Sequence, residues 1–122
     1  MTQQITIITA ALFGMLSVIF GAFGAHALKK ILSEDQLKSF ETGVKYQMYH
    51  ALVLLIVGLT FNKISAGLYW SFTVGIILFS FSIYGLVISS AKEKKMSFLG
   101  PVTPLGGLLL IIGWAFVLTS AF

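Results

Sequence analysis

Residues 67–90 read GLYWSFTVGIILFSFSIYGLVISS and contain no aspartate, glutamate, lysine or arginine. A helix that crosses the hydrocarbon core of a bilayer needs about 20 apolar residues, because the core is about 30 Å thick and a helix rises about 1.5 Å per residue. The backbone in such a core must also satisfy its own hydrogen bonds, which favours a helix. This stretch therefore predicts a membrane-spanning helix.

Three further stretches extend this pattern. Residues 5–28 and 104–122 are also free of charged side chains and long enough to span. Residues 46–61 are too short to span comfortably, unless their helix begins earlier, in the polar segment before them, and crosses the membrane at a tilt. We therefore expect four transmembrane helices.

The polar segment contains a signal for the start of that second helix. Ser33 is followed three residues later by Gln36, the spacing of a capping box, which predicts a helix over residues 34–61. Charged residues in its first half are separated around the helix from Leu37, Phe40 and Val44. We expect this amphipathic half to lie in the membrane interface and to join the spanning half either at a bend at Gly43 or as a straight, tilted helix.

Composition supports a membrane protein. Apolar residues make up 57% of the chain and charged residues 10%, which is too little charge to coat a soluble globule of this size. The absence of cysteine excludes disulfides and thiolate catalysis. The predicted fold class is all-α: a polytopic membrane protein with a four-helix transmembrane bundle, an interfacial amphipathic extension before the second helix, and a single domain over residues 1–122.

The lysines predict the orientation. Seven of the eight lie within residues 29–45 and 92–95, and only Lys63 lies on the opposite side. Since lysine-rich loops stay in the cytoplasm, we expect both termini outside the plasma (inner) membrane, with loops 29–45 and 91–98 cytoplasmic. A cleaved signal peptide ending near residues 25–27 is the competing interpretation of the first stretch, but that stretch lacks a basic start.

The positive charge also bears on partners. The net charge is +4, but the cations are all lysines beside membrane segments, where anionic lipid headgroups attract them. We therefore expect membrane lipids as partners, including those with anionic headgroups, and no nucleic acid. A homo-oligomer or a membrane protein partner is a further candidate.

Small residues recur along the apolar stretches, as they do where lipid-embedded helices approach closely. Internal packing is the favoured interpretation, and contacts between copies of the chain are the alternative. The glycines expected at such contacts are Gly14, Gly21, Gly24, Gly85, Gly106 and Gly113. At the start of the last helix, Thr103 is a candidate N-cap and Pro104 a candidate first residue.

The histidines are the main candidates for a ligand site. We expect His26, which ends the first helix, and His50, which lies early in the second, at a similar depth, and Tyr46, Gln47 and His50 fall on one side of the second helix. Polar groups at this depth usually pair with neighbouring helices, so structural hydrogen bonding is the favoured role. A small polar ligand or a relayed proton is the second possibility, and ligation of a haem or metal the third. No metal, no cofactor and no catalytic residue is assigned.

The same residues carry a resemblance to a known family. The blocks are GAFGAH (21–26), TGVKYQMYHAL (42–52), LFSFSIY (78–84) and TPLGG (103–107), with Gly113-Trp114 after them. In this order they resemble the YgdD-type family of small membrane proteins, known as domain of unknown function four-two-three. The resemblance implies a four-helix inner-membrane protein and supplies no activity. Phe81 departs from the family pattern, where glycine is more usual, which relaxes a close helix contact there.

No complete catalytic, metal or nucleotide motif is present in the sequence. The leading functional hypothesis is a small non-enzymatic scaffold or accessory subunit that binds lipid or a partner protein. The alternative is a transporter-like bundle that handles a small ligand or protons near His26 and His50. An integral-membrane enzyme is least favoured, because the spanning stretches contain no carboxylate.

Overall fold

The computed structural model describes residues 1–122, apart from the side chain of Ala25. Within this described part the regular elements are all helical, so the all-α prediction is confirmed. The elements are α1 (Gln3–Ile19), η1 (Phe20–Gly24), α2 (Ala25–Leu28), α3 (Glu34–Thr60), α4 (Ala66–Ile76), η2 (Ile77–Phe81), α5 (Ser82–Ala91), η3 (Ser97–Leu99) and α6 (Val102–Thr119).

Three helical stretches among the described residues are long and apolar enough to cross a membrane. They are Gln3–Leu28, Ala66–Ala91 and Ser97–Thr119. They correspond to the three uncharged stretches of the sequence. α3 is as long as these but carries charged side chains in its first half, and it runs as one α-helix through Gly43.

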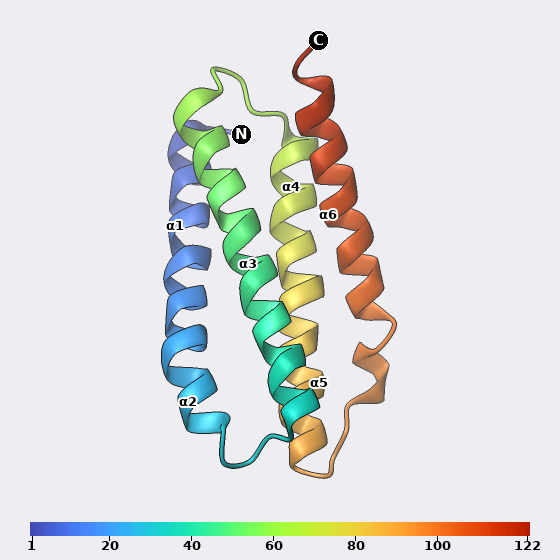
Figure 1. Ribbon diagram of the computed structural model, residues 1–122. Coiled ribbons are helices and arrows are strands. Elements are labelled where there is room, and N and C mark those ends of the chain that lie inside the picture. The colour runs from blue at the N-terminus through green and yellow to red at the C-terminus, as the bar shows by residue number, and fades with distance from the viewer.

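The long helices run side by side, with α1 packed on α3 and α4 packed on α6 (Figure 1). α3 also contacts η2 and α5, so it connects the two pairs. Both chain ends lie at the end of the molecule that holds the 61–65 connection, and the connections at 29–33 and 92–96 lie at the opposite end (Figure 1).

Local sequence sets the start of α3. Ser33 accepts a hydrogen bond from the backbone N–H of Gln36, and the Gln36 side chain accepts one from the backbone N–H of Ser33. This is the predicted capping box, and it satisfies two amides that a helix start leaves free.

The predicted cap of the last helix is wrong. α6 begins at Val102, with Pro101 as its cap residue. The Thr103 hydroxyl bonds instead to the Ser82 hydroxyl at 2.6 Å, because α5 lies against the start of α6 and offers a side-chain partner. Pro104 lies in the first turn, where its missing N–H leaves no intrahelical bond unmade.

Two of the apolar stretches contain a π-helical turn: η1 lies in Gln3–Leu28, and η2 lies in Ala66–Ala91. A π-turn inserts an extra residue and rotates the side chains that follow it. Helix faces that are assigned to the sequence at 100° per residue are therefore rotated after residues 77–81.

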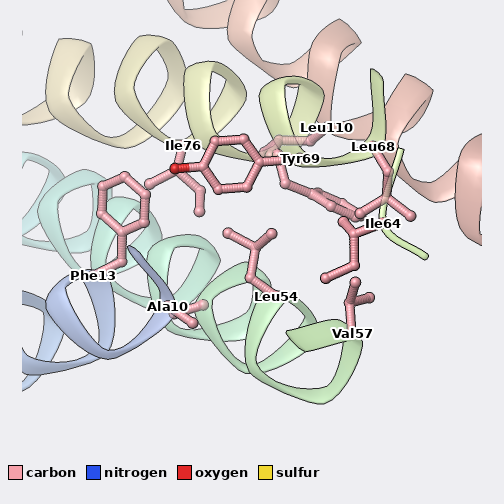
Figure 2. Close-up of a cluster of buried hydrophobic side chains, with 11 residues drawn as sticks. Ala10, Phe13, Leu54, Val57, Ile64, Leu68, Tyr69, Ile76 and Leu110 are labelled. Carbon is pink, nitrogen blue, oxygen red and sulfur yellow. The ribbon is translucent and has the colours of Figure 1, made fainter. Parts of the chain in front are cut away.

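The main core lies where α1, α3, α4 and α6 meet. Figure 2 shows its side chains converging from these helices and from Ile64 in the connection before α4. A second cluster, Leu32, Phe40, Tyr84 and Val87, lies near the opposite end of the molecule. The apolar face of the first half of α3 is thus buried against the rest of the chain.

Glycines let α4, η2 and α6 approach closely. A Cβ atom added at Gly113 would lie 2.7 Å from the Phe72 ring, and one at Gly75 would lie 2.8 Å from the Leu110 side chain. A Cβ at Gly106 would overlap the backbone nitrogen of Phe79. Large side chains therefore pack onto glycines of the facing helix, and at Gly106 backbone packs on backbone.

Three other predicted glycines have side-chain neighbours. A Cβ at Gly21 would lie 3.1 Å from Val44, and one at Gly24 would lie 3.2 Å from Phe40, both on α3. At Gly85 the neighbour is Leu99, at 2.7 Å.

Packing of Gly14 inside the bundle, the favoured interpretation, is not found. A Cβ built there has nothing within 4 Å, because the side chains of Ala10, Phe13 and Ser17 form the buried face of α1 and Gly14 lies beside that face.

Candidate functional site

The largest hollow described is a groove between α3 and α6, floored in part by η2. It has a volume of about 790 Å³. Its walls are mainly apolar and aromatic, and they are formed by Tyr46, Tyr49, His50, Phe79, Pro104, Gly107, Leu108, Leu110, Ile111 and Trp114. Exposed Leu108 and Ile111 lie on its α6 side. We call this hollow the α3–α6 groove.

His50 is the buried polar group of the α3–α6 groove, and both of its ring nitrogens have partners. The indole N–H of Trp114 donates to Nε2 at 3.1 Å, and Nδ1 lies 2.6 Å from the Tyr46 carbonyl oxygen. An indole can only donate, so Nε2 must accept and Nδ1 must carry the proton that it donates to the carbonyl. The geometry therefore fits a neutral imidazole in a single tautomer.

This arrangement limits what His50 can bind. A metal or haem iron at Nε2 would have to displace the Trp114 indole, and a second proton on the ring would break the same bond. The ring is also enclosed by aromatics, with the Phe72 and Trp114 centroids 5.7 and 6.1 Å away. The bonding is that of a structural link between α3 and α6.

Tyr46 lies on the wall of the α3–α6 groove, one turn before His50. Its ring centroid is 4.9 Å from that of Phe79 and 6.1 Å from that of His50. The side chain is 41% exposed. Tyr46 therefore places an accessible phenol beside the groove.

Gln47 faces away from the groove and is fully buried. Its Nε2 donates to the Phe13 carbonyl at 2.8 Å, and its Oε1 accepts from the Tyr84 hydroxyl at 2.7 Å. The expectation that Gln47 and His50 bond to neighbouring helices is confirmed. The two side chains lie only about 60° apart around α3, but they reach different neighbours: Gln47 bonds to α1 and α5, and His50 bonds to α6. They therefore do not line one common site.

Two serines add bonds at the same level. Ser17 donates to the Val44 carbonyl at 2.9 Å, and Ser80, in η2, donates to the Gly43 carbonyl at 2.7 Å. With Gln47 they tie α3 to α1, η2 and α5.

His26 and His50 do not meet. His26 is exposed and lies in α2. Gly24, just before it, lies against Phe40, which precedes His50 by ten residues, or about 15 Å of helix. The expected similar depth is wrong because α1 and α2 run antiparallel to α3, so the end of the first stretch lies beside the start of α3.

Sequence reasoning missed the partners that complete these contacts, which are Trp114, Tyr84, Ser80 and Phe79. An indole N–H and a phenol within apolar stretches indicate a need for partners. The sequence does not indicate which residues become the partners of the Trp114 indole and the Tyr84 phenol.

The comparisons with known proteins agree with the resemblance in the sequence. A family described as "Protein of unknown function (DUF423)" matches residues 20–107. The UPF0382 membrane protein SAB0533 of Staphylococcus aureus (strain bovine RF122 / ET3-1) is 41% identical to this chain, covering 98% of it and 97% of the relative. The UPF0382 membrane protein YwdK of Bacillus subtilis (strain 168) is 39% identical, with the same two coverages.

The UPF0382 inner membrane protein YgdD of Escherichia coli (strain K12) is 36% identical, covering 99% of this chain and 92% of the relative. No solved structure matches the chain. The match to the family and the identity over almost the full length of these relatives lead to one conclusion: the chain belongs to the DUF423 family, whose relatives here are named UPF0382 membrane proteins.

Proposed function

We propose that the chain is a single-domain, four-helix transmembrane bundle in which α3 is the fourth crossing and its charged first half lies in the interface. The three apolar stretches and the membrane names of the relatives support this proposal. Placement of both chain ends opposite the lysine-rich connections supports termini outside and loops 29–45 and 91–98 in the cytoplasm.

Within that bundle, the proposed function is non-enzymatic: the chain acts as an accessory subunit that holds a lipid in the α3–α6 groove. The observation that carries this proposal is the open, apolar hollow of about 790 Å³ beside exposed apolar residues of α6. A hollow of this size in the bilayer has to be filled, because empty space forfeits dispersion contacts. A lipid chain supplies apolar groups at that depth.

A small-ligand or proton-handling site is the second candidate. It is favoured by the accessible phenol of Tyr46 and the ring of His50 on the same groove wall. The bonds to both ring nitrogens of His50 weigh against it, since the ring would have to release Trp114 to take a proton or ligand. His26 and Gln47 face other surroundings, so they are not part of this candidate.

The test fills the α3–α6 groove with a side chain. A Cβ at Gly107 would lie 3.6 Å from the Phe79 ring, an ordinary contact, so Gly107→Leu adds bulk without forcing the backbone apart. Gly14→Leu is the matched control, because it adds the same side chain to a glycine with open space around it. Lipid that stays with the purified protein after detergent exchange is measured by mass spectrometry.

We expect Gly107→Leu to lose the retained lipid and Gly14→Leu to keep it. Equal retention by both variants, with both folded, would contradict lipid binding in the groove. Retention in both, together with a polar small molecule lost only from His50→Ala, would favour the second candidate.

A further inference from the structure

Two smaller hollows continue the α3–α6 groove toward the end of the molecule that holds the 29–33 and 92–96 connections. The middle one has a volume of about 410 Å³ and shares Pro104 with the groove. The outer one has a volume of about 340 Å³ and shares Ser39, Leu86, Val87 and Gly100 with the middle one. Because neighbouring hollows share lining residues, the three lie in a row along α3, and we call this row the track.

The polarity of this track changes along its length. The inner end is the apolar α3–α6 groove. The walls of the middle hollow include the hydroxyl-bearing residues Ser39, Thr42 and Thr103. The outer hollow is lined by the charged Asp35 and Lys95 and by polar groups that include Gln36 and Ser90. A track that is apolar at one end and charged at the other matches the two ends of an amphiphile.

The length of the track matches one leaflet of a bilayer. Gln36, in the outer hollow, precedes His50, in the inner one, by 14 residues of the same helix, or about 21 Å. A bilayer with its headgroup regions is about 40–45 Å thick, so one leaflet is about 20–22 Å. A phospholipid lying along the track would place its headgroup at Asp35 and Lys95 and its acyl chain beside His50 and Trp114.

The charges of the outer hollow specify the headgroup. We propose that this track binds one phospholipid whose headgroup carries both a phosphate and a primary amine, with Lys95 contacting the phosphate and Asp35 the amine. This inference rests on the proposed function and names the class of lipid. An acidic headgroup without an amine would pair with Lys95 and leave the Asp35 carboxylate facing a like charge, whereas a headgroup with both a phosphate and an amine pairs with both side chains.

The test compares headgroups on the full-length protein. The protein is reconstituted in nanodiscs made from phosphatidylcholine with one added lipid: phosphatidylethanolamine, phosphatidylglycerol, or neither. Bound lipid is quantified by native mass spectrometry after release from the disc. We expect phosphatidylethanolamine to be enriched over phosphatidylglycerol and over phosphatidylcholine.

Two variants act on the headgroup alone. Asp35→Asn should remove the preference for the primary amine, and Lys95→Gln should weaken retention of every phospholipid by about two- to fivefold, the range of an exposed ion pair. The matched controls are Glu34→Gln, on the same turn of α3, and Lys92→Gln, on the same connection as Lys95. Neither control residue lines the track, so both variants should bind as the unaltered chain does.

The possible results separate this inference from the proposed function. Enrichment of phosphatidylglycerol, or an Asp35→Asn variant that keeps the preference for the amine, would overturn the headgroup assignment while Gly107→Leu still abolishes retention. If Gly107→Leu retains lipid as well, the α3–α6 groove itself is not the binding site. A second copy of the chain in place of lipid, seen as a dimer in the same spectra, would overturn both.

Discussion

Trp114 donates its indole N–H to Nε2 of His50 across a distance of 3.1 Å, and this bond joins α6 to α3. The two residues are 64 positions apart in the chain. His50 is 5% exposed, so without Trp114 its Nε2 would be left in an apolar environment with little access to water.

The first prediction concerns this bond. Trp114→Phe keeps an aromatic ring but removes the donor, and we expect it to lower the free energy of unfolding by about 1 to 3 kcal/mol, the penalty for an unpaired buried polar group. Thermal unfolding in detergent measures the change. Trp70→Phe is the control, because Trp70 is 51% exposed on α4. Equal melting temperatures for the two variants would show that the bond adds no stability.

The second prediction concerns Gln47 and Tyr84. Tyr84→Phe leaves Oε1 of the fully buried Gln47 without its donor, so we expect a loss of about 1 to 3 kcal/mol. The control is Tyr49→Phe, which removes a hydroxyl from a side chain that is 54% exposed. Chemical unfolding of both variants gives the comparison. A Tyr84→Phe protein as stable as the control would contradict the pairing.

The third prediction compares two glycines. Gly106→Ala places a methyl group against the backbone of Leu78 and Phe79, which cannot move aside as a side chain can, so we expect a loss of about 1 to 3 kcal/mol. Gly14→Ala meets open space, and its better helix propensity should leave stability unchanged or raise it by up to about 1 kcal/mol. Thermal unfolding of the two variants in detergent measures both changes in stability. Similar losses at both positions would mean that Gly14 also lies at a contact.

The fourth prediction concerns orientation. The chain has no cysteine, so single cysteines can be introduced at the exposed positions Asn62 and Ser97. Ser97→Cys should react with a membrane-impermeant maleimide only from the cytoplasmic side, and Asn62→Cys only from outside, because loops rich in lysine stay in the cytoplasm. Labelling of intact cells tests access from outside, and labelling of inverted vesicles tests access from the cytoplasmic side. Reversed labelling would invert the proposed topology.

Part of the candidate site could be predicted from the sequence, and part could not. Polar residues in an apolar stretch need partners, so bonds from Gln47 and His50 to neighbouring helices could be expected. Which neighbouring helix each of them reaches could not be expected from the sequence. Gln47 and His50 are three residues apart and lie about 60° apart around the helix, and only the positions of α1, α5 and α6 determine which helix each side chain reaches.

The sequence by itself determined the helical class, the three apolar stretches and the start of α3, because hydropathy and capping act on residues that are close together in the chain. Tertiary structure alone decided that Trp114 pairs with His50, that Gly106 packs on a backbone while Gly14 packs on nothing, and that His26 lies far from His50. These contacts depend on which helices are neighbours and on the rotation that the π-turns impose. Neither is set by interactions within a single helix.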